Sequence, residues 1–202
     1  MIEGIGISKK FDDNILFNRL NFKIEEGEFI CFSGVSGSGK TTLLNIIGLL
    51  EPFDDGKLLF NGKEVSSYKE KLEFYRYDVG FVFQNFVLIE NKTVRENLEM
   101  VNKKYRTSYS IKNVLERVDL LDKIDSKVYT LSGGEQQRIA LARLFFKKSS
   151  IVLADEPTGS LDYANAKKVM EILKELNNEG HIVILVTHDE KTKLIADRII
   201  EL

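Results

Sequence analysis

The sequence predicts an α/β fold with a parallel sheet, and the clearest signs come from its last third. The runs "IVLAD" (151–155) and "HIVILVTH" (181–188) are uninterrupted apolar stretches bounded by polar residues. Such runs suit strands that are covered on both faces, as in a parallel sheet. The segment between them ends at Gly180 and places four apolar residues on one helical face: Val169, Ile172, Leu173 and Leu176. Strand, helix and strand in this order form a crossover unit.

The N-terminal third predicts one more buried strand and an antiparallel piece. "EFICFSG" (28–34) has the apolar run of a buried strand and leads directly into a glycine-rich turn. "KTTLLNIIGLL" (40–50) follows with helical spacing of its apolar residues and stops before Pro52. "DDGKLLFNGKEV" (54–65) predicts a turn, a strand, a hairpin turn at Asn61–Gly62 and a short return strand.

Residues 85–148 predict an inserted helical part. "SIKNVLERVDLL" (110–121) and "GEQQRIALARLFF" (134–146) have the spacing of amphipathic helices, and little between them indicates a strand. We therefore expect a single domain over the whole chain. Its α/β core, with the antiparallel piece, comprises residues 1–84 and 149–202, and the helical subdomain lies between them.

Composition restricts the class of protein. The 202 residues can bury a substantial core, and the net charge of −2 argues against a nucleic-acid-binding protein, which usually has a basic excess. We expect the basic cluster "NKKYR" (Asn102–Arg106) to be a solvated loop. Cys31 is the only cysteine, so no internal disulfide can form. Its apolar neighbours predict that it is buried, which fits a reducing cytoplasm.

Nothing in the sequence predicts direct insertion into a membrane. No apolar run approaches the roughly 20 residues that cross a bilayer. The first residues, "MIEGIGISKKF", lack the apolar region and cleavage site of a secretory signal. We expect a cytoplasmic protein that meets a membrane only through another protein.

A phosphate-binding loop is predicted at "GVSGSGKTT". Gly34, Gly39, Lys40 and Thr41 fill the pattern GxxxxGK[ST] between a predicted strand and a predicted helix. Glycines let backbone N–H groups curl around phosphate oxygens, and the helix N-terminus favours the negative charge. Lys40 would reach the β- and γ-phosphates, and the Thr41 hydroxyl would bind Mg²⁺. A chance glycine turn is the alternative, and it leaves the flanking strand and helix unexplained.

Two acidic residues follow the strand "IVLAD". Asp155 stands where a carboxylate associated with Mg²⁺ belongs in such a site. Glu156 comes next and is the candidate to polarise an attacking water. A surface salt bridge is the alternative for Glu156, because structural ion pairs also use acidic residues.

Three further residues have weaker support. His188 follows the neighbouring predicted strand, and parallel strands bring their carboxyl ends to one crevice; taken alone, a structural or exposed histidine is the more common case. Gln84 follows the strand-like run "GFVF" and could bind the metal or orient water, or be a polar residue satisfied at a strand end. Phe11 is equally consistent with the core and with a ring stacked on a base.

A second phosphate cradle is predicted far from the first. "LSGGEQQRIALAR" (131–143) opens a predicted helix with one serine and two glycines, which is how helix ends are prepared for anions. One small chain has no evident use for two such cradles.

Taken together, these motifs resemble the nucleotide-binding subunits of ATP-binding cassette (ABC) transporters over nearly the whole chain. "GVSGSGKTT" resembles the Walker A loop, "IVLADE" the Walker B strand with its glutamate, and "LSGGEQQ" the family signature. "FVFQ" resembles the Q-loop, "GSLD" (159–162) the D-loop and "VTHD" the H-loop. Phe11 occupies the place of the aromatic residue that stacks on adenine, where tyrosine is more common. "LADEPTGSLD" and "GFVFQNF" are similar to the branch of lipoprotein-releasing, macrolide-exporting, bacteriocin-exporting and cell-division ATPases.

The resemblance implies a P-loop NTPase fold with a RecA-like core, an antiparallel β subdomain and a helical subdomain. It also implies ATP and Mg²⁺ as cofactors. The residues expected to contact nucleotide are Phe11, Gly34, Val35, Ser36, Gly37, Ser38, Gly39, Lys40, Thr41, Thr42, Ser132, Gly133, Gly134, Gln136 and Asp162. The residues expected at the metal are Thr41, Gln84 and Asp155. Those expected to serve hydrolysis are Lys40, Gln84, Glu156 and His188.

The resemblance also gives the second cradle a use. Family members pair head to tail, so Ser132 and the Gly133–Gly134 backbone would contact the γ-phosphate held by a second copy of the chain. Hydrogen bonds to a charged group are worth about 1.5–3 kcal/mol each, so ATP could decide whether two copies stay together.

The function implied is that of an ATP-hydrolysing motor on the inner face of the plasma membrane. It would drive a separately encoded integral membrane permease, as an exporter or extractor of peptide, lipoprotein or drug-like cargo. A cell-division-type ATPase that transmits a signal without moving cargo is the alternative. DNA-repair ABC proteins are disfavoured because no coiled-coil heptads interrupt the cassette, and translation-type proteins would need a second cassette. A small-molecule kinase has no use for "LSGGEQQ".

A contact surface for the permease is expected next to Gln84. Phe86, Val87, Leu88 and Ile89 form a dense apolar run. A buried strand or turn is the alternative, and exposure of two or more of these side chains would favour a docking surface.

Overall fold

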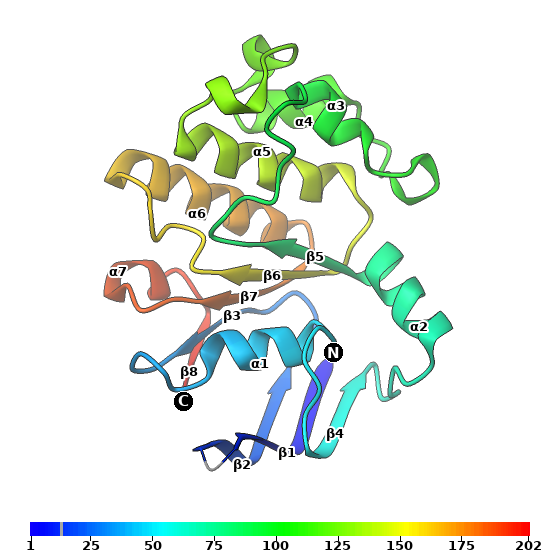
Figure 1. The fold of residues 1–202 in the computed structure, drawn as a ribbon, viewed down its shortest axis with the longest axis vertical. Coiled ribbons are helices and arrows are strands. Elements are labelled where there is room, and N and C mark those ends of the chain that lie inside the picture. Colours follow the sequence, from blue (N-terminus) through cyan, green and yellow to red (C-terminus); the bar gives the residue numbers. More distant parts are fainter. Residues whose placement is uncertain (13) are drawn as a thin grey trace.

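The main sheet has five strands, and all neighbouring strands pair in parallel (Figure 1). The structure is a computed structural model that describes residues 1–12 and 14–202, without the side chains of Glu190 and Lys191. The strands, in order across the sheet, are β5 (Val79–Val82), β6 (Ile151–Asp155), β7 (Ile182–Val186), β3 (Phe29–Ser33) and β8 (Arg198–Glu201). The three buried strands expected from the sequence are confirmed, and so is their parallel arrangement. Strand β7 is shorter than the apolar run that predicted it, because His181 and Thr187–His188 lie outside the ladder.

Helices cover both faces of this sheet, and successive side chains of each strand alternate between them. Ile30 and Phe32 of β3 pack in one cluster with α1 (Lys40–Ile47), whereas Phe29 and Cys31 pack in another with α5 (Gly133–Phe146) and α6 (Tyr163–Asn178). Burial of the expected apolar face of α6 is confirmed. Cys31 is buried as predicted, and burial raises the pKa of its thiol to about 11.

A second, antiparallel sheet lies beyond α1, at the lower end of the molecule in Figure 1. Its strands, in order, are β2 (Asn14–Ile24), β1 (Ile2–Phe11) and β4 (Asp55–Phe60). The turn at Asn61–Gly62 is present, with φ of 50° and 75°. The predicted return strand is wrong, because it is reduced to a single bridge between Phe60 and Lys63. Only Val65 is apolar in the returning segment "KEVSS", so a fourth strand would have no face to bury.

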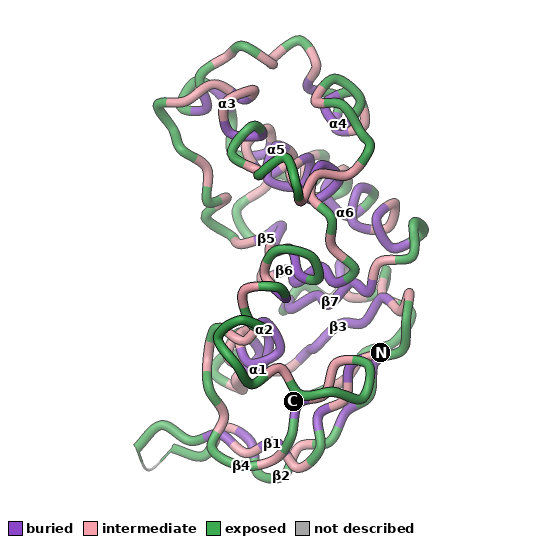
Figure 2. Tube along the Cα trace, turned by 90° about the vertical axis from the view of Figure 1, so that its right-hand side faces the viewer, coloured by how far each residue is buried: buried purple, intermediate pink, exposed green. Residues whose placement is uncertain are grey.

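The helical part forms the opposite end of the molecule, and the purple core in Figure 2 continues into it through α5 and α6. It contains α3 (Val94–Glu99), α4 (Ile111–Arg117) and α5, each opened by a capping box whose serine or threonine accepts a backbone N–H. Both expected helices are therefore confirmed, although α4 stops early, before the left-handed residue Asp119.

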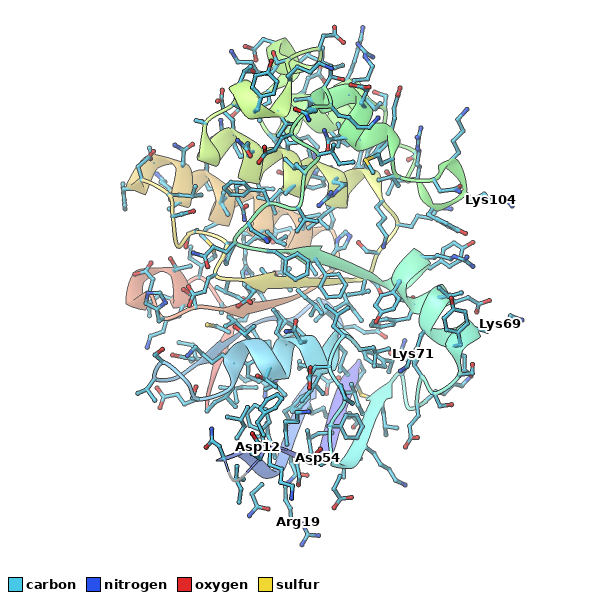
Figure 3. All side chains as sticks on the ribbon, viewed as in Figure 1. Asp12, Arg19, Asp54, Lys69, Lys71 and Lys104 are labelled. Carbon is cyan, nitrogen blue, oxygen red and sulfur yellow. The ribbon has the colours of Figure 1, made fainter. Side chains whose placement is uncertain are left out.

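Short helical turns connect the remaining elements. They comprise α2 (Tyr68–Glu73), a π-helical turn (Phe74–Asp78), three 3₁₀ turns (Lys103–Tyr105, Leu121–Lys123 and Val128–Thr130) and α7 (Glu190–Lys193). Asn102, Lys103 and Lys104 are exposed as expected, and Lys104 projects outward in Figure 3. Arg106 departs from the expected solvated cluster, because its guanidinium donates to the carbonyls of Val101 and Glu99. Among the described residues, no helix combines the length and the apolar character needed to span a bilayer.

Candidate functional site

The carboxyl ends of β3, β6 and β7 meet at one edge of the parallel sheet and form a cavity of about 400 Å³. The glycine-rich loop follows β3, and His188 lies two residues after the end of β7. The cavity is lined by Phe11, Leu16, Ser36, Gly37, Gly39, Lys40, Thr41, Thr42, Glu156, Val186 and His188. An adjoining hollow shares Ser36 and His188 and adds two further residues of the loop, Gly34 and Val35. The structure thus brings most of the expected residues together.

The loop presents unused donors to this cavity. Gly39 is the N-cap of α1, has a left-handed φ of 93° and provides no side-chain cap, so the first N–H groups of the helix remain for an anion. The Ser38 hydroxyl is buried and has no hydrogen-bond partner among the described residues. A buried hydroxyl without a partner is costly, and a phosphate oxygen would satisfy it. The loop therefore fits a phosphate group.

Lys40 is buried in the wall of the cavity, and its ammonium is fixed by the loop itself. Nζ donates to the carbonyls of Gly34 and Val35, at 2.9 and 2.8 Å. An ammonium has three N–H donors, so a third can serve a phosphate oxygen. The two carbonyl bonds hold the positive charge at the place where the loop would hold phosphate.

A metal ion fits beside the loop, where two oxygen ligands already meet. Thr41 Oγ1 donates to Asp155 Oδ1 at 3.0 Å. Burial raises the pKa of Asp155, and the charge of Glu156 adds to this, while the Thr41 bond opposes it. A divalent cation would compensate a carboxylate in such surroundings, and hydroxyl and carboxylate oxygens are the ligands that Mg²⁺ prefers.

Glu156 and His188 form a bonded pair at the mouth of the cavity. Glu156 Oε1 accepts from the His188 backbone N–H at 3.1 Å and lies 2.7 Å from His188 Nδ1, and Oε2 accepts from the Thr187 hydroxyl at 3.1 Å. An ionised carboxylate only accepts, so the Nδ1 atom carries the proton. Glu156 has a left-handed φ of 44°, a strained conformation typical of functional sites. Glu156 is therefore paired, as the ion-pair alternative expected, and its histidine partner lines the same cavity as the phosphate loop.

Phe11 is not a core residue. Its side chain is 47% exposed and lines the cavity, and the Lys9 ammonium lies 4.6 Å from the ring centroid on one side. The alternative of a core position is therefore wrong, and the ring offers a surface to a planar group.

Gln84 stands apart from the cavity lining. Its side chain is exposed after β5, and its Nε2 atom lies 3.4 Å from the point where a Cβ on Gly159 would stand. The structure therefore places Gln84 against the "GSLD" turn, the segment from Gly159 to Asp162. Nothing in the sequence spacing shows this neighbour, because it depends on how β5 and β6 pair.

The second cradle lies outside the cavity formed by the chain's own phosphate loop. Ser132 and Gly133 are exposed at the start of α5, and no residue of α5 is among the described residues that line the cavity. Ser132 caps α5 reciprocally with Glu135, whose N–H donates to Ser132 Oγ at 3.3 Å. The hydrogen bond from the Ser132 backbone N–H to the Glu135 carboxylate lowers the pKa of Glu135. Gln136 bonds to the Leu131 carbonyl, which secures the same turn.

Arg138 and Asn165, which the sequence did not indicate, join this cradle to α6. Asp162 is the N-cap of α6 and accepts from the Asn165 backbone N–H at 2.9 Å. Arg138 of α5 donates to Asn165 Oδ1 at 2.5 Å. The pattern Asp-x-x-Asn before a helix could have indicated the cap, but not the bond across to α5.

Gly134 is required by this contact. A Cβ at Gly134 would stand 2.3 Å from Asn165 Cγ, whereas one at Gly133 would meet only Phe86 Cζ, at an ordinary 3.6 Å. We expect Gly134→Ala to lower the free energy of unfolding by about 1–3 kcal/mol through overpacking, and the exposed Gly133→Ala to change it by less than about 0.5 kcal/mol. Urea denaturation of both variants measures this, and equal losses would contradict the assigned contact.

The comparisons with known proteins agree with this geometry. The sequence profile described as "ABC transporter" matches residues 17–159. A macrolide export ATP-binding/permease protein of Campylobacter jejuni is 40% identical over 97% of this chain, and the chain spans 32% of that protein's length. An uncharacterised ABC transporter ATP-binding protein of Methanocaldococcus jannaschii is 42% identical, over 93% of this chain and 87% of its own length.

Solved structures give the same answer for the fold. The dimeric ABC transporter cassette MJ0796 superposes with a TM-score of 0.87 at 37% identity, covering all of this chain and 94% of that one. The same cassette in a post-hydrolysis dimer bound to ADP and Pi gives a TM-score of 0.86 at 36% identity, with the same coverage. The RecA-like core, the antiparallel sheet and the helical insertion are therefore confirmed. The chain belongs to the ABC transporter family and is one of its ATP-binding, ATP-hydrolysing cassettes.

Proposed function

We propose that this chain is the motor subunit of an ABC transporter and works as a head-to-tail dimer joined to a membrane permease. The observation that carries the proposal is the exposed, glycine-rich start of α5, which takes no part in the chain's own cavity. An anion site that its own chain does not use suits the nucleotide of a second copy. The similar MJ0796 cassette is a dimer, which supports the pairing of two copies.

In the proposed site, the first turn of α1, Ser38 and Lys40 hold the phosphates, and Phe11 stacks on the adenine. Thr41 and Asp155 would hold Mg²⁺, and Gln84 would join them when its segment moves toward the cavity. When bound, Mg²⁺ supplies positive charge that offsets the charge of the β- and γ-phosphates.

Glu156 is proposed to orient and polarise the attacking water. Its carboxylate is fixed by Thr187 and His188, so it is pre-oriented, and a proton taken from water would reside on a group already hydrogen-bonded. His188 Nδ1 is engaged by Glu156, so only Nε2 remains for the γ-phosphate, and it would bond a phosphate oxygen as an N–H donor when both ring nitrogens carry protons. His188 thus links the water-activating carboxylate to the phosphate.

The permease is proposed to dock in a second cavity, of about 310 Å³, beside β5. Its lining is mainly apolar: Tyr75, Val79, Gly80, Phe81, Phe83, Val87, Val101, Arg143, Leu144 and Lys147. Val87 and Ile89 are 52% and 41% exposed, which meets the condition of two exposed side chains in the apolar run. Leu88 does not belong to this surface, because it is partly buried against the core.

A charged side chain at Val87, the exposed residue of this groove, tests the docking site. We expect Val87→Glu to abolish co-purification with the permease and stimulation by it, because a carboxylate would be buried without a partner in an apolar interface. Val87→Ala serves as the control and should retain both. Thermal denaturation and ATP binding of the free subunit should be unchanged in the two variants. Normal co-purification of Val87→Glu would exclude this groove.

Export is the proposed direction of transport. Similar proteins are named for export of macrolides and, in Pseudomonas syringae, as a probable exporter of syringafactin. The chain spans about a third of the length of those proteins, so their activity is carried over only as part of this proposal. Identification of the membrane protein that co-purifies with this chain, followed by ATPase assays of the pair, tests the whole proposal. A chain that hydrolyses no ATP with that partner would contradict it.

A further inference from the structure

The turn after β5 contains two consecutive left-handed residues that are not glycine. Phe86 has a φ of 58° and Val87 a φ of 49°. This conformation is uncommon for any residue with a side chain, and it is a genuine outlier for a β-branched one. Such a conformation persists only where the surrounding structure holds it in place. The question is which side chain does so.

Arg143, on the third turn of α5, donates hydrogen bonds to the backbone carbonyls of Phe86 and Val87. Nη1 donates to the Val87 carbonyl at 2.8 Å, and Nη2 to the Phe86 carbonyl at 3.5 Å. Burial lowers the pKa of Arg143, and no carboxylate among the described residues forms an ion pair with it. A half-buried guanidinium without a counter-charge depends on the dipoles of the groups it contacts. Its position is therefore tied to the left-handed turn.

The same turn also contacts the start of α5. The Phe86 ring carbon Cζ lies 3.6 Å from where a Cβ on Gly133 would stand, and Gly133 follows the cap residue Ser132. Gly133 and Arg143 are separated by roughly 15 Å along the helix. The turn is thus fastened at two places on one rigid helix, and Gln84 lies only two residues before it.

We propose that Arg143 is a positioning residue that fastens the turn Phe86–Val87 to α5, so that Gln84 and Ser132 change position together. This latch, formed by Phe86, Val87 and Arg143, rests on the proposed function, in which Gln84 serves the chain's own ATP and Ser132 that of a second copy. A docked permease that displaces the turn would then shift Gln84 at one nucleotide site and, through α5, Ser132 at the other. No member of the latch lines the phosphate cavity, so it acts on turnover and not on ATP affinity.

Hydrogen exchange of the complete chain tests the latch without any assay of function. The Phe86 and Val87 amides donate to the carbonyls of Phe83 and Asn85. In Arg143→Met we expect these two amides to exchange about tenfold faster or more, since the turn opens locally. Arg143→Lys can reach one carbonyl at a time, so its rates should lie between the two.

Arg117→Met is the matched control. Arg117 is also a partly buried arginine of the helical part, bonded to Glu175 and packed on Phe145, but it does not contact the turn. This variant should lose stability without faster exchange at Phe86 and Val87. Unchanged exchange in Arg143→Met, or equal acceleration in Arg117→Met, would overturn the latch.

A second substitution separates the left-handed strain from general packing. Glycine adopts positive φ without steric cost and alanine does not. In the Arg143→Met background, Val87→Gly should therefore restore slow exchange at Phe86, and Val87→Ala should not. Rescue by neither substitution, or by both alike, would contradict the proposed role. This comparison stays informative with Arg143→Lys if Arg143→Met fails to fold.

Steady-state ATP hydrolysis supplies the functional readout. We expect Arg143→Met to lower kcat about tenfold or more, because small displacements of positioned groups are costly, with KM within about twofold of the wild type. Val87→Gly should return most of the lost kcat. A change confined to KM would overturn the latch. Absence of ATP hydrolysis in the wild-type chain with its permease would instead contradict the proposed function, and the exchange rates would still decide on the latch.

Discussion

Glu156→Gln is expected to lower ATP turnover by about 10²–10⁴-fold, as for loss of a positioned acid–base group, while ATP affinity stays nearly unchanged. In glutamine the amide oxygen can accept from the His188 backbone in place of Oε1, and the NH2 group, in place of Oε2, can donate to the Thr187 hydroxyl oxygen, so the geometry of the site is retained. Glutamine cannot take a proton from water. The variant should therefore accumulate as an ATP-bound dimer, which size-exclusion chromatography with ATP detects.

Lys40→Ala is the contrasting variant. It removes the charge held beside the loop by the Gly34 and Val35 carbonyls, so it should weaken ATP binding as well as turnover. Binding of a fluorescent ATP analogue and steady-state turnover, measured on both variants, separate the two effects. Wild-type turnover in Glu156→Gln would show that another group activates the water.

Mixing two inactive variants should restore ATPase activity. In a head-to-tail dimer of Lys40→Ala with Ser132→Asp, one composite site has both defects and the other has neither. Ser132→Asp suits this test because aspartate also caps a helix well, while its charge repels the γ-phosphate of the other copy. If pairing is random and the sites are independent, an equal mixture should reach about a quarter of wild-type activity.

The mixing curve distinguishes the two arrangements of the site. A site completed within one chain gives only residual activity at every ratio, because each chain then carries its own defect. The matched control mixes Lys40→Ala with Glu156→Gln, whose two sites are both defective, since these residues line the same cavity of one chain. Recovery in that control mixture equal to recovery with Ser132→Asp would contradict the head-to-tail site.

The structure also shows where a pattern in the sequence led to a wrong expectation. The Asn61–Gly62 turn is local chemistry and formed as predicted, but its return strand did not, since a strand needs a partner and a face to bury. Leu88 was expected beside Val87 on the docking surface and instead packs against the core. A run of apolar residues shows only that these side chains can be buried. The neighbouring elements of the fold decide which of them are.

The parallel strands, the phosphate loop and the acidic pair after β6 could be predicted from the sequence. Each of these depends on residues that are adjacent in the chain: apolar runs, glycines that permit a tight turn, and a lysine and threonine at a helix start. Three contacts could be found only in the folded chain: Gln84 lies against Gly159, Asn165 leaves room only for glycine at position 134, and Arg143 bonds to the carbonyls of Phe86 and Val87. These contacts join elements far apart in sequence, and their free energy comes from packing and hydrogen bonds that no local pattern encodes.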